Sequence, residues 1–186
     1  MTIAMLTVSA IICAYTEARW LDLIAAVESL RQQSLQPQEI ILVIDHNQRL
    51  LERAREEFLD VLVIENSEAQ GLSGARNSGI AVACASLIAF LDDDATAERE
   101  WLAQFKDCFE NPNVLGVGGT VEPEWLSRQP AWFPSEFYWV LGCTYLTRRI
   151  DRVMLANRNA KNLTASIDSS VVSLTPYQAH TIPWLL

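Results

Sequence analysis

Three consecutive carboxylates, Asp92, Asp93 and Asp94, follow the apolar run of residues 87–91. Adjacent carboxylates repel one another, so a bound cation or water must screen their charge. In an extended segment Asp92 and Asp94 point to one side, whereas Asp93 points to the other. The outer pair therefore predicts a site for Mg²⁺ or Mn²⁺, hard cations that keep water and phosphate oxygens as further ligands. A solvated acidic turn is the alternative interpretation.

Polar residues also follow two earlier apolar runs and a glycine-bearing loop. Tyr15 and Glu17 come after residues 7–13, and Asp45 ends the run that begins at residue 39. An acid such as Asp45 can accept hydrogen bonds from a nucleobase or a ribose, or it can cap the following turn. Arg76 follows the loop that begins at residue 71 and is predicted to enter a helix, a place suited to phosphate binding. A salt bridge to a neighbouring acid is equally compatible with Arg76.

These residues must be positioned by an alternation of β-rich and amphipathic segments. Apolar residues at offsets 0, 3, 4, 7 and 10 from Trp20 predict a helix. The same patterns predict strands over residues 7–13, 39–45, 61–65, 87–91 and 114–117, and helices over residues 20–30, 50–58, 78–85 and 98–109. This order predicts an α/β fold with a mostly parallel central sheet. Because ligands collect at the carboxyl ends of parallel strands, the polar residues should meet at one edge.

Composition excludes several classes of function. The 186-residue chain carries 14 basic and 23 acidic residues, a net charge of −9, which disfavours nucleic acid as a partner. It has no P-loop, no dinucleotide fingerprint and no CxxC pair. Met1–Ala14 lacks the basic start of a signal peptide, and no apolar run is long enough to cross a bilayer. We expect a cytoplasmic protein, which is compatible with peripheral association with the inner face of the membrane.

The charge balance changes along the chain. Residues 1–145 hold 9 basic and 21 acidic residues, whereas residues 146–186 hold 5 basic and 2 acidic residues. Residues 146–186 also lack a clear helical or alternating pattern. We therefore predict a folded domain over residues 1–145 and an atypical C-terminal tail, disordered or aberrant, over residues 146–186.

Four segments, in this order, resemble the successive motifs of family 2 glycosyltransferases with the GT-A fold: residues 8–15 with Glu17, residues 39–45, residues 71–79 and residues 88–94. The resemblance covers roughly residues 7–145. It implies a GT-A-type, Rossmann-like αβα sandwich that binds a nucleoside diphosphate sugar as donor. The acceptor, a glycan, a lipid or another hydroxyl compound, is not specified.

The resemblance also assigns residues to the nucleoside. Ala14, Tyr15 and Glu17 match the loop that holds the nucleoside, and Asp45 matches the acid that contacts the base, usually uracil.

The diphosphate end of the donor is assigned in the same way. Arg76 matches the basic residue near the diphosphate, and Gly74 in the preceding loop belongs to the same donor-binding set. Asp92 and Asp94, with Asp93 between them, match the DXD motif, whose outer acids grip the donor through Mg²⁺ or Mn²⁺.

One part of the family pattern is missing from the sequence. Inverting members carry an acidic general base further along the chain, often in a Glu-Asp pair, and no such pair follows residue 145. A truncated or altered C-terminus would explain this, and donor binding is then better supported than turnover. A non-catalytic nucleotide-sugar-binding remnant is therefore one alternative function.

A haloacid-dehalogenase-like phosphotransferase is the other alternative. Asp92 to Thr96 fits the DxDxT pattern of that family, with Asp92 as nucleophile and Asp94 as acid and base. That motif normally closes the first strand of its fold, whereas three predicted strands precede Asp92.

Overall fold

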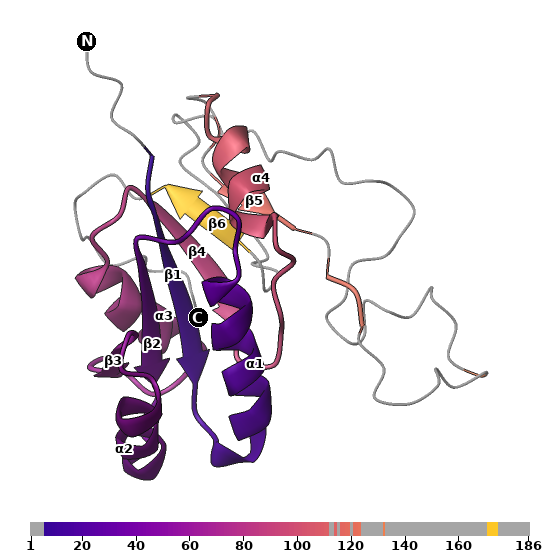
Figure 1. The fold of residues 1–186 in the computed structure, drawn as a ribbon. Helices are drawn as coiled ribbons and strands as arrows, with labels where there is room; N and C mark the ends of the chain where they lie inside the picture. The colour runs from indigo at the N-terminus through magenta and orange to yellow at the C-terminus, as the bar shows by residue number, and fades with distance from the viewer. Residues whose placement is uncertain are drawn as a thin grey trace.

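The computed structural model describes residues 6–111, 114, 116–119, 121–123 and 132, and the backbone of residues 171–174. Its centre is a six-stranded sheet in the order β3-β2-β1-β4-β6-β5 (Figure 1). The strands are β1 (Val8–Ala14), β2 (Glu39–Ile44), β3 (Leu62–Glu65), β4 (Leu87–Asp92), β5 (Gly116–Gly118) and β6 (Val171–Leu174). The first four are parallel, and β6 runs antiparallel to both β4 and β5. The predicted α/β class with a mostly parallel sheet is confirmed.

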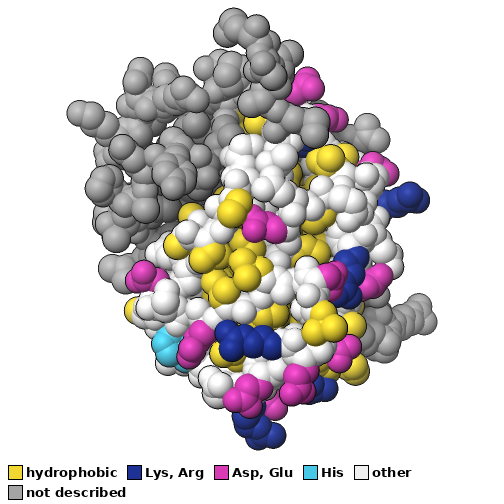
Figure 2. Space-filling view, turned by 60° about the vertical axis from the view of Figure 1, so that its left-hand side comes forward, with side chains coloured by type: hydrophobic (Ala, Val, Ile, Leu, Met, Phe, Trp, Pro, Cys, Tyr) yellow, Lys and Arg dark blue, Asp and Glu magenta, His cyan; other side chains and the backbone are white. Residues whose placement is uncertain are grey.

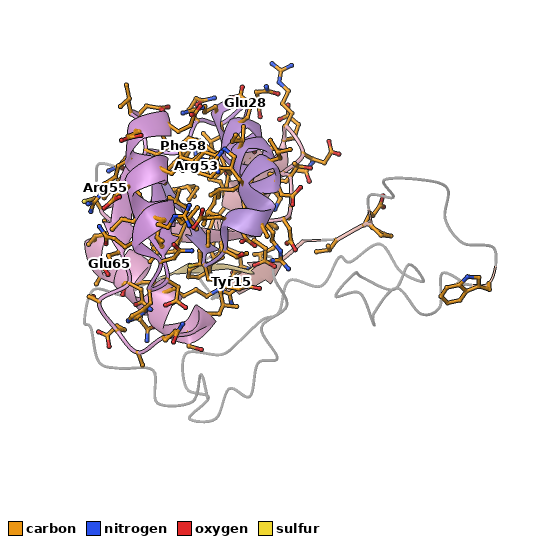
Figure 3. The ribbon with its side chains drawn as sticks, turned by 90° about the horizontal axis from the view of Figure 1, so that it is seen from below. Tyr15, Glu28, Arg53, Arg55, Phe58 and Glu65 are labelled. Carbon is orange, nitrogen blue, oxygen red and sulfur yellow. The ribbon has the colours of Figure 1, made fainter. Side chains whose placement is uncertain are left out.

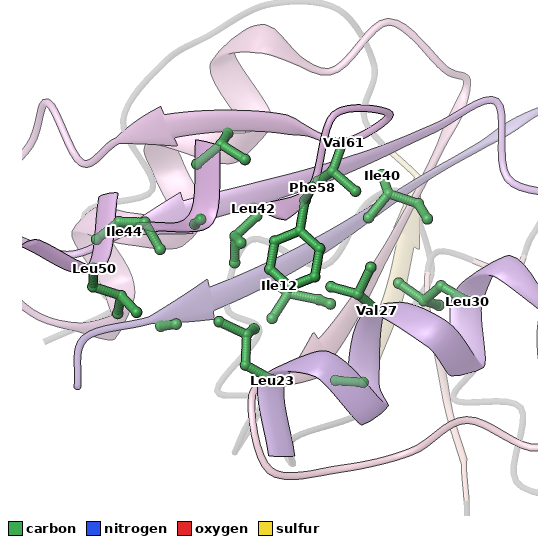
Figure 4. Packing of buried hydrophobic residues seen from close by; sticks show 14 of the residues in the cluster. Ile12, Leu23, Val27, Leu30, Ile40, Leu42, Ile44, Leu50, Phe58 and Val61 are labelled. Carbon is green, nitrogen blue, oxygen red and sulfur yellow. The ribbon is translucent and has the colours of Figure 1, made fainter. Parts of the chain in front are cut away.

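Helices cover both faces of this sheet. They are η1 (Glu17–Arg19), α1 (Trp20–Arg31), α2 (Gln48–Glu57), α3 (Leu72–Val82) and α4 (Trp101–Cys108). Side chains of β1 alternate between the two faces: Ile12 packs with α1 and α2, and Ile11 packs with α3. Figure 4 shows the first of these layers, where Leu23 and Val27 of α1 lie against the sheet. Full burial of each such aliphatic side chain contributes about 1.5–3 kcal/mol.

The start of α3 differs from the prediction. Residues 71–77 were expected to form a loop that enters a helix at residue 78, but the helix already begins at Leu72. Gly71 precedes it with φ of 124°, a backbone conformation that favours glycine. A side chain at Gly79 would place its Cβ 2.8 Å from Ile11 Cγ2, so the absence of a side chain there lets α3 pack closely on the sheet. The small residues therefore belong to the helix rather than to a loop.

The C-terminal region contributes one element to the described structure. β6 pairs with β4 between Val172 and Ala89, so part of the predicted tail joins the sheet. The boundary at residue 145 and the other residues of 146–186 lie outside the described residues. Within the part of the chain that the structure describes, no helix is long and apolar enough to cross a membrane.

Candidate functional site

A cavity of about 630 Å³ lies at the carboxyl ends of β1, β2 and β4. It is lined by Cys13, Ala14, Tyr15, Arg19, Asp45, Gln70, Gly71, Leu72, Ala75, Asp92, Asp93 and Asp94. Six of the nine predicted site residues are therefore brought together: Ala14, Tyr15, Asp45 and the three aspartates. Figure 3 looks onto this end of the molecule, where Tyr15 lies with 58% of its surface exposed. The three distant segments converge because parallel strands end at the same edge.

Asp45 is the most extensively hydrogen-bonded acid in the cavity. Its Oδ1 accepts a hydrogen bond from Asn66 Nδ2 at 2.6 Å and lies 2.8 Å from His46 Nδ1. Its Oδ2 accepts from the backbone N–H of Gly71 at 2.9 Å. Burial of Asp45 favours the neutral acid, but these hydrogen bonds from Asn66, His46 and Gly71 outweigh it and lower the pKa of the carboxyl group below its ordinary value. Asp45 is thus held as a carboxylate in a fixed orientation.

Asn66 is a supporting residue that the sequence analysis missed. It follows β3 and is only 3% exposed. Besides donating to Asp45, its Oδ1 accepts from the backbone N–H of Glu68 at 2.9 Å and from Ser78 Oγ at 2.8 Å. Asn66 therefore links Asp45 to Ser78 in the middle of α3. Its position directly after a predicted strand was the available signal, since the other site acids occupy the same kind of position.

The three aspartates do not alternate as an extended segment would. β4 ends at Asp92, and Ala95 donates its N–H to the Asp92 carbonyl at 3.2 Å, so the chain turns. As a result, the carboxylates of Asp93 and Asp94 both reach Nη1 of Arg19, at 3.0 and 3.1 Å. The expectation that Asp93 points away from Asp94 is therefore wrong.

Asp93 is the buried member of the acidic segment. Its side chain is 7% exposed, against 47% for Asp94. Burial raises the pKa of Asp93, and the hydrogen bond from Arg19 offsets this only in part. Among the described residues, Asp93 Oδ2 has no hydrogen-bond partner. Arg19 is therefore the main compensation for this carboxyl group.

Among the residues that the structure describes, Arg19 and Arg76 are the arginines that contact the aspartates. Arg19 lines the cavity, although the sequence analysis did not select it. Arg76 lies behind the cavity wall, with its side chain 8% exposed, its Nη2 3.5 Å from Asp92 Oδ1 and its guanidinium over the Phe90 ring. Arg76 therefore forms the salt bridge that was its alternative interpretation. Figure 2 shows acidic and basic side chains mixed at the lower end of the molecule, below a patch of hydrophobic side chains.

Two further predicted residues do not line the cavity. Glu17 lies in η1, and its Oε1 is 3.9 Å from Nε of Arg49. Gly74 lies in α3, where a Cβ would be 1.9 Å from the backbone oxygen of Ala69. The structure thus gives Gly74 a packing role, because only glycine lets the segment before α3 come this close.

The donor chemistry of the site fits a hard divalent cation. Asp92 and Asp94 are partly exposed carboxylates on the cavity wall. No group of three or more His, Cys, Asp or Glu side chains within the described ranges is placed to hold a metal ion. An ion here would have at most two protein ligands and would take the others from phosphate and water, as Mg²⁺ commonly does.

Cys13 also lines the cavity, but it is not an activated nucleophile. Burial raises the pKa of its thiol to about 12, and the nearby charge of Arg76 lowers it only in part. The thiol is therefore protonated at neutral pH.

The family model described as glycosyl transferase family 2 matches residues 9–169. This chain belongs to glycosyltransferase family 2. The match extends past residue 145, where we expected the family pattern to end. Membership of family 2 agrees with the parallel sheet and with the position of the cavity at its carboxyl edge.

Three curated relatives are also glycosyltransferases by name. Glucosyl-dolichyl phosphate glucuronosyltransferase of Haloferax volcanii is 39% identical over 140 residues, which are 73% of this chain and 45% of the relative. An uncharacterized glycosyltransferase of Nostoc sp. is 30% identical over 59% of this chain and 35% of its own length. Glycosyltransferase AglE of Haloferax volcanii is 28% identical over 66% of this chain and 41% of its own length. The chain spans less than half the length of each of these relatives.

Proposed function

We propose that the cavity binds a nucleoside diphosphate sugar and that the protein transfers the sugar to a hydroxyl group of an acceptor. One observation carries this proposal: in a family 2 chain, Asp45, Tyr15 and the acidic segment of residues 92–94 line one cavity. The cavity, at about 630 Å³, lies within the usual range for small-molecule sites of roughly 300–1,000 Å³.

The nucleoside would occupy the side of the cavity formed by β1, β2 and the start of α3. Tyr15 and Leu72 are both more than half exposed and line the cavity, so they offer apolar surface to a base. Asp45 is held as a carboxylate and can accept a further hydrogen bond from a base N–H. An N–H such as that of uracil would suit this acceptor, which supports a UDP-linked donor.

The diphosphate would lie toward β4. Asp92 and Asp94 would hold Mg²⁺ or Mn²⁺, which would screen the phosphates and stabilise the negative charge of the departing nucleoside diphosphate. Arg19 lines the same wall and can donate hydrogen bonds to phosphate oxygens. A local cluster of this kind allows a chain with a net charge of −9 to accept a polyanion.

The sugar and the acceptor are suggested only by relatives. The name of the Haloferax glucuronosyltransferase makes a uronic acid donor and a lipid-linked acceptor reasonable first candidates. Both sugar transfer and donor binding alone agree with the described residues. Nothing in those residues favours the phosphotransferase alternative.

A thermal-shift panel tests the proposal. UDP, GDP and CDP, and UDP-linked glucose, glucuronic acid and N-acetylglucosamine, should be screened with Mn²⁺ and with EDTA. A ligand that binds the folded state raises its melting temperature, so we expect at least one UDP compound to stabilise the protein in Mn²⁺. Stabilisation by none of these compounds would contradict the proposed function. A positive donor should then be tested for sugar transfer to a polyprenyl phosphate glycan, with the Asp94→Asn variant as the negative control.

A further inference from the structure

Arg19 contacts two acids of the cavity, Asp93 and Asp94. It is the last residue of η1, directly after the segment that leaves β1. A single nitrogen, Nη1, is 3.0 Å from Asp93 Oδ1 and 3.1 Å from Asp94 Oδ2. The single positive charge of the guanidinium is therefore shared by two carboxylates that belong to another segment of the chain.

The two carboxylates differ in how easily they can leave Arg19. The Asp93 side chain is 7% exposed, and its Oδ2 has no hydrogen-bond partner among the described residues. Separating Asp93 from Arg19 would leave a buried charge without compensation, which is costly. The Asp94 side chain is 47% exposed, so water or a cation can replace the guanidinium at modest cost.

A divalent cation and Arg19 would compete for Asp94. Both are positive and both need the same carboxylate, so each weakens the binding of the other. The guanidinium has five N–H donors, and a donor released from Asp94 can turn to a phosphate oxygen. The carboxylate of Asp94 can therefore exchange the Arg19 guanidinium for a metal ion.

We propose that Arg19 is an exchangeable counter-ion, which stays on Asp93 but passes Asp94 to the metal ion and turns its freed N–H to the diphosphate. This inference rests on the proposed function, since it assumes that nucleotide and metal ion bind in this cavity. It makes Arg19 a positioning residue that suppresses binding of the metal ion alone and supports binding of the nucleotide.

Removing the charge of Arg19 should therefore move two affinities in opposite directions. In Arg19→Gln, Asp94 is free of its competitor, so Mn²⁺ alone should bind about fivefold more tightly. In saturating Mn²⁺, where Asp94 is held by the metal ion, UDP loses a cationic partner in this variant and should bind about fivefold more weakly. A residue that only supported the local fold would weaken both.

The experiment uses the full chain and two titrations. Binding of Mn²⁺ alone is measured by electron paramagnetic resonance, and binding of UDP in saturating Mn²⁺ is measured by calorimetry. Arg49→Gln is the matched control, because this substitution also removes one positive charge. Arg49 is 86% exposed and lies at the same end of the molecule. We expect less than about a twofold change for this control in either titration. Arg19→Lys keeps the charge but not the planar fork, and it should fall between wild type and Arg19→Gln.

Each outcome bears on a specific statement. If Arg19→Gln weakens Mn²⁺ binding, or leaves both affinities unchanged, the exchange proposal is wrong while the proposed function survives. If wild type binds neither Mn²⁺ nor UDP in any combination, the proposed function itself fails. Should Arg19→Gln not fold because Asp93 is left buried and unpaired, the double variant Arg19→Gln/Asp93→Asn removes both charges. It should still tighten Mn²⁺ binding, and failure to do so would overturn the exchange.

Discussion

The acids at the ends of β2 and β4 lie in one cavity but are stabilised in different ways. Asp45 receives hydrogen bonds from Asn66, from the backbone of Gly71 and from the neighbouring His46. Asp93 and Asp94 instead share one guanidinium, and one buried oxygen of Asp93 has no hydrogen-bond partner among the described residues. One end of the cavity is fixed by several hydrogen-bond donors, and the other is balanced by a single guanidinium.

This difference matches what each end would bind. A nucleoside needs a rigid acceptor in a fixed direction, because hydrogen-bond recognition depends on geometry. A metal ion with a diphosphate needs carboxylates that can exchange partners, because charges must rearrange when the ion arrives. The four predictions below test this contrast, from the largest expected effect to the smallest.

Asp94→Asn should abolish most of the dependence of UDP binding on Mn²⁺. The contacts of UDP with the β2 end of the cavity should remain. Loss of one of two carboxylate ligands should weaken UDP binding in Mn²⁺ by about 100-fold, equivalent to about 2.7 kcal/mol. UDP binding in EDTA should change by less than about threefold. Calorimetry with and without Mn²⁺ measures both, and Asp107→Asn, an exposed acid on α4, is the control. Equal weakening in the two buffers would show that Asp94 does not act through the metal.

Asn66→Ala should disturb the rigid end through its support. The substitution removes a donor from Asp45 and leaves Ser78 Oγ and the Glu68 N–H without their acceptor. Unpaired buried groups of this kind should lower the free energy of unfolding by about 2–3 kcal/mol. Urea denaturation provides the measurement. Gln48→Ala, at an exposed position of α2, should cost less than about 0.5 kcal/mol, and a similar loss in both variants would remove Asn66 from the account.

The lowered pKa of Asp45 predicts that wild type and Asp45→Asn differ in free energy of unfolding by an amount that depends on pH. The folded-state pKa lies below the ordinary value of 3.8, so the unfolded state binds this proton more tightly. The stabilisation is complete well above 3.8 and is lost as the pH falls through the folded-state pKa. We expect wild type to exceed Asp45→Asn by about 1–2 kcal/mol at pH 7, with the gap narrowing below about pH 4. A constant gap from pH 7 to pH 3 would contradict the assignment.

Asp60→Asn should have the smallest effect on the free energy of unfolding and on UDP affinity. It is the reference for a salt bridge outside the cavity. Asp60 pairs with Arg31 at the surface, where its side chain is 60% exposed. Such pairs contribute at most about 1 kcal/mol, so unfolding by urea should change by less than this, and UDP affinity should be unchanged. An effect on UDP affinity equal to that of Asp94→Asn would mean that general charge, rather than the cavity, controls binding.

Arg31, the partner of Asp60, also helps to hold helices α1 and α2 together. Arg31 also lies over the Phe58 ring, and Arg53 lies over Trp20 at 3.9 Å from the ring centroid. None of these residues lines the cavity, and their contacts serve the packing of the scaffold.

The sequence predicted the parallel strands and the edge of the sheet at which the cavity lies, because buried strands are continuous apolar runs and their carboxyl ends share one edge. It failed at residues 71–77, where small residues with Gly71 at positive φ begin a helix rather than a loop. Arg19 could not be selected, because its role depends on a contact with Asp93, 74 positions further along the chain. For Asn66 the only signal was its position after a predicted strand, since its contact with Asp45, 21 positions earlier, could not be predicted. Turns such as that after Asp92 also override the alternation expected of an extended segment.

Calorimetric titration of the wild-type chain with UDP, in Mn²⁺ and in EDTA, tests the central claim most directly. We expect saturable binding that is about 100-fold tighter in Mn²⁺, because the ion joins the diphosphate to Asp92 and Asp94. Absence of UDP binding in both buffers, or equal affinity in the two, would contradict a metal-assisted nucleotide site at the ends of β2 and β4.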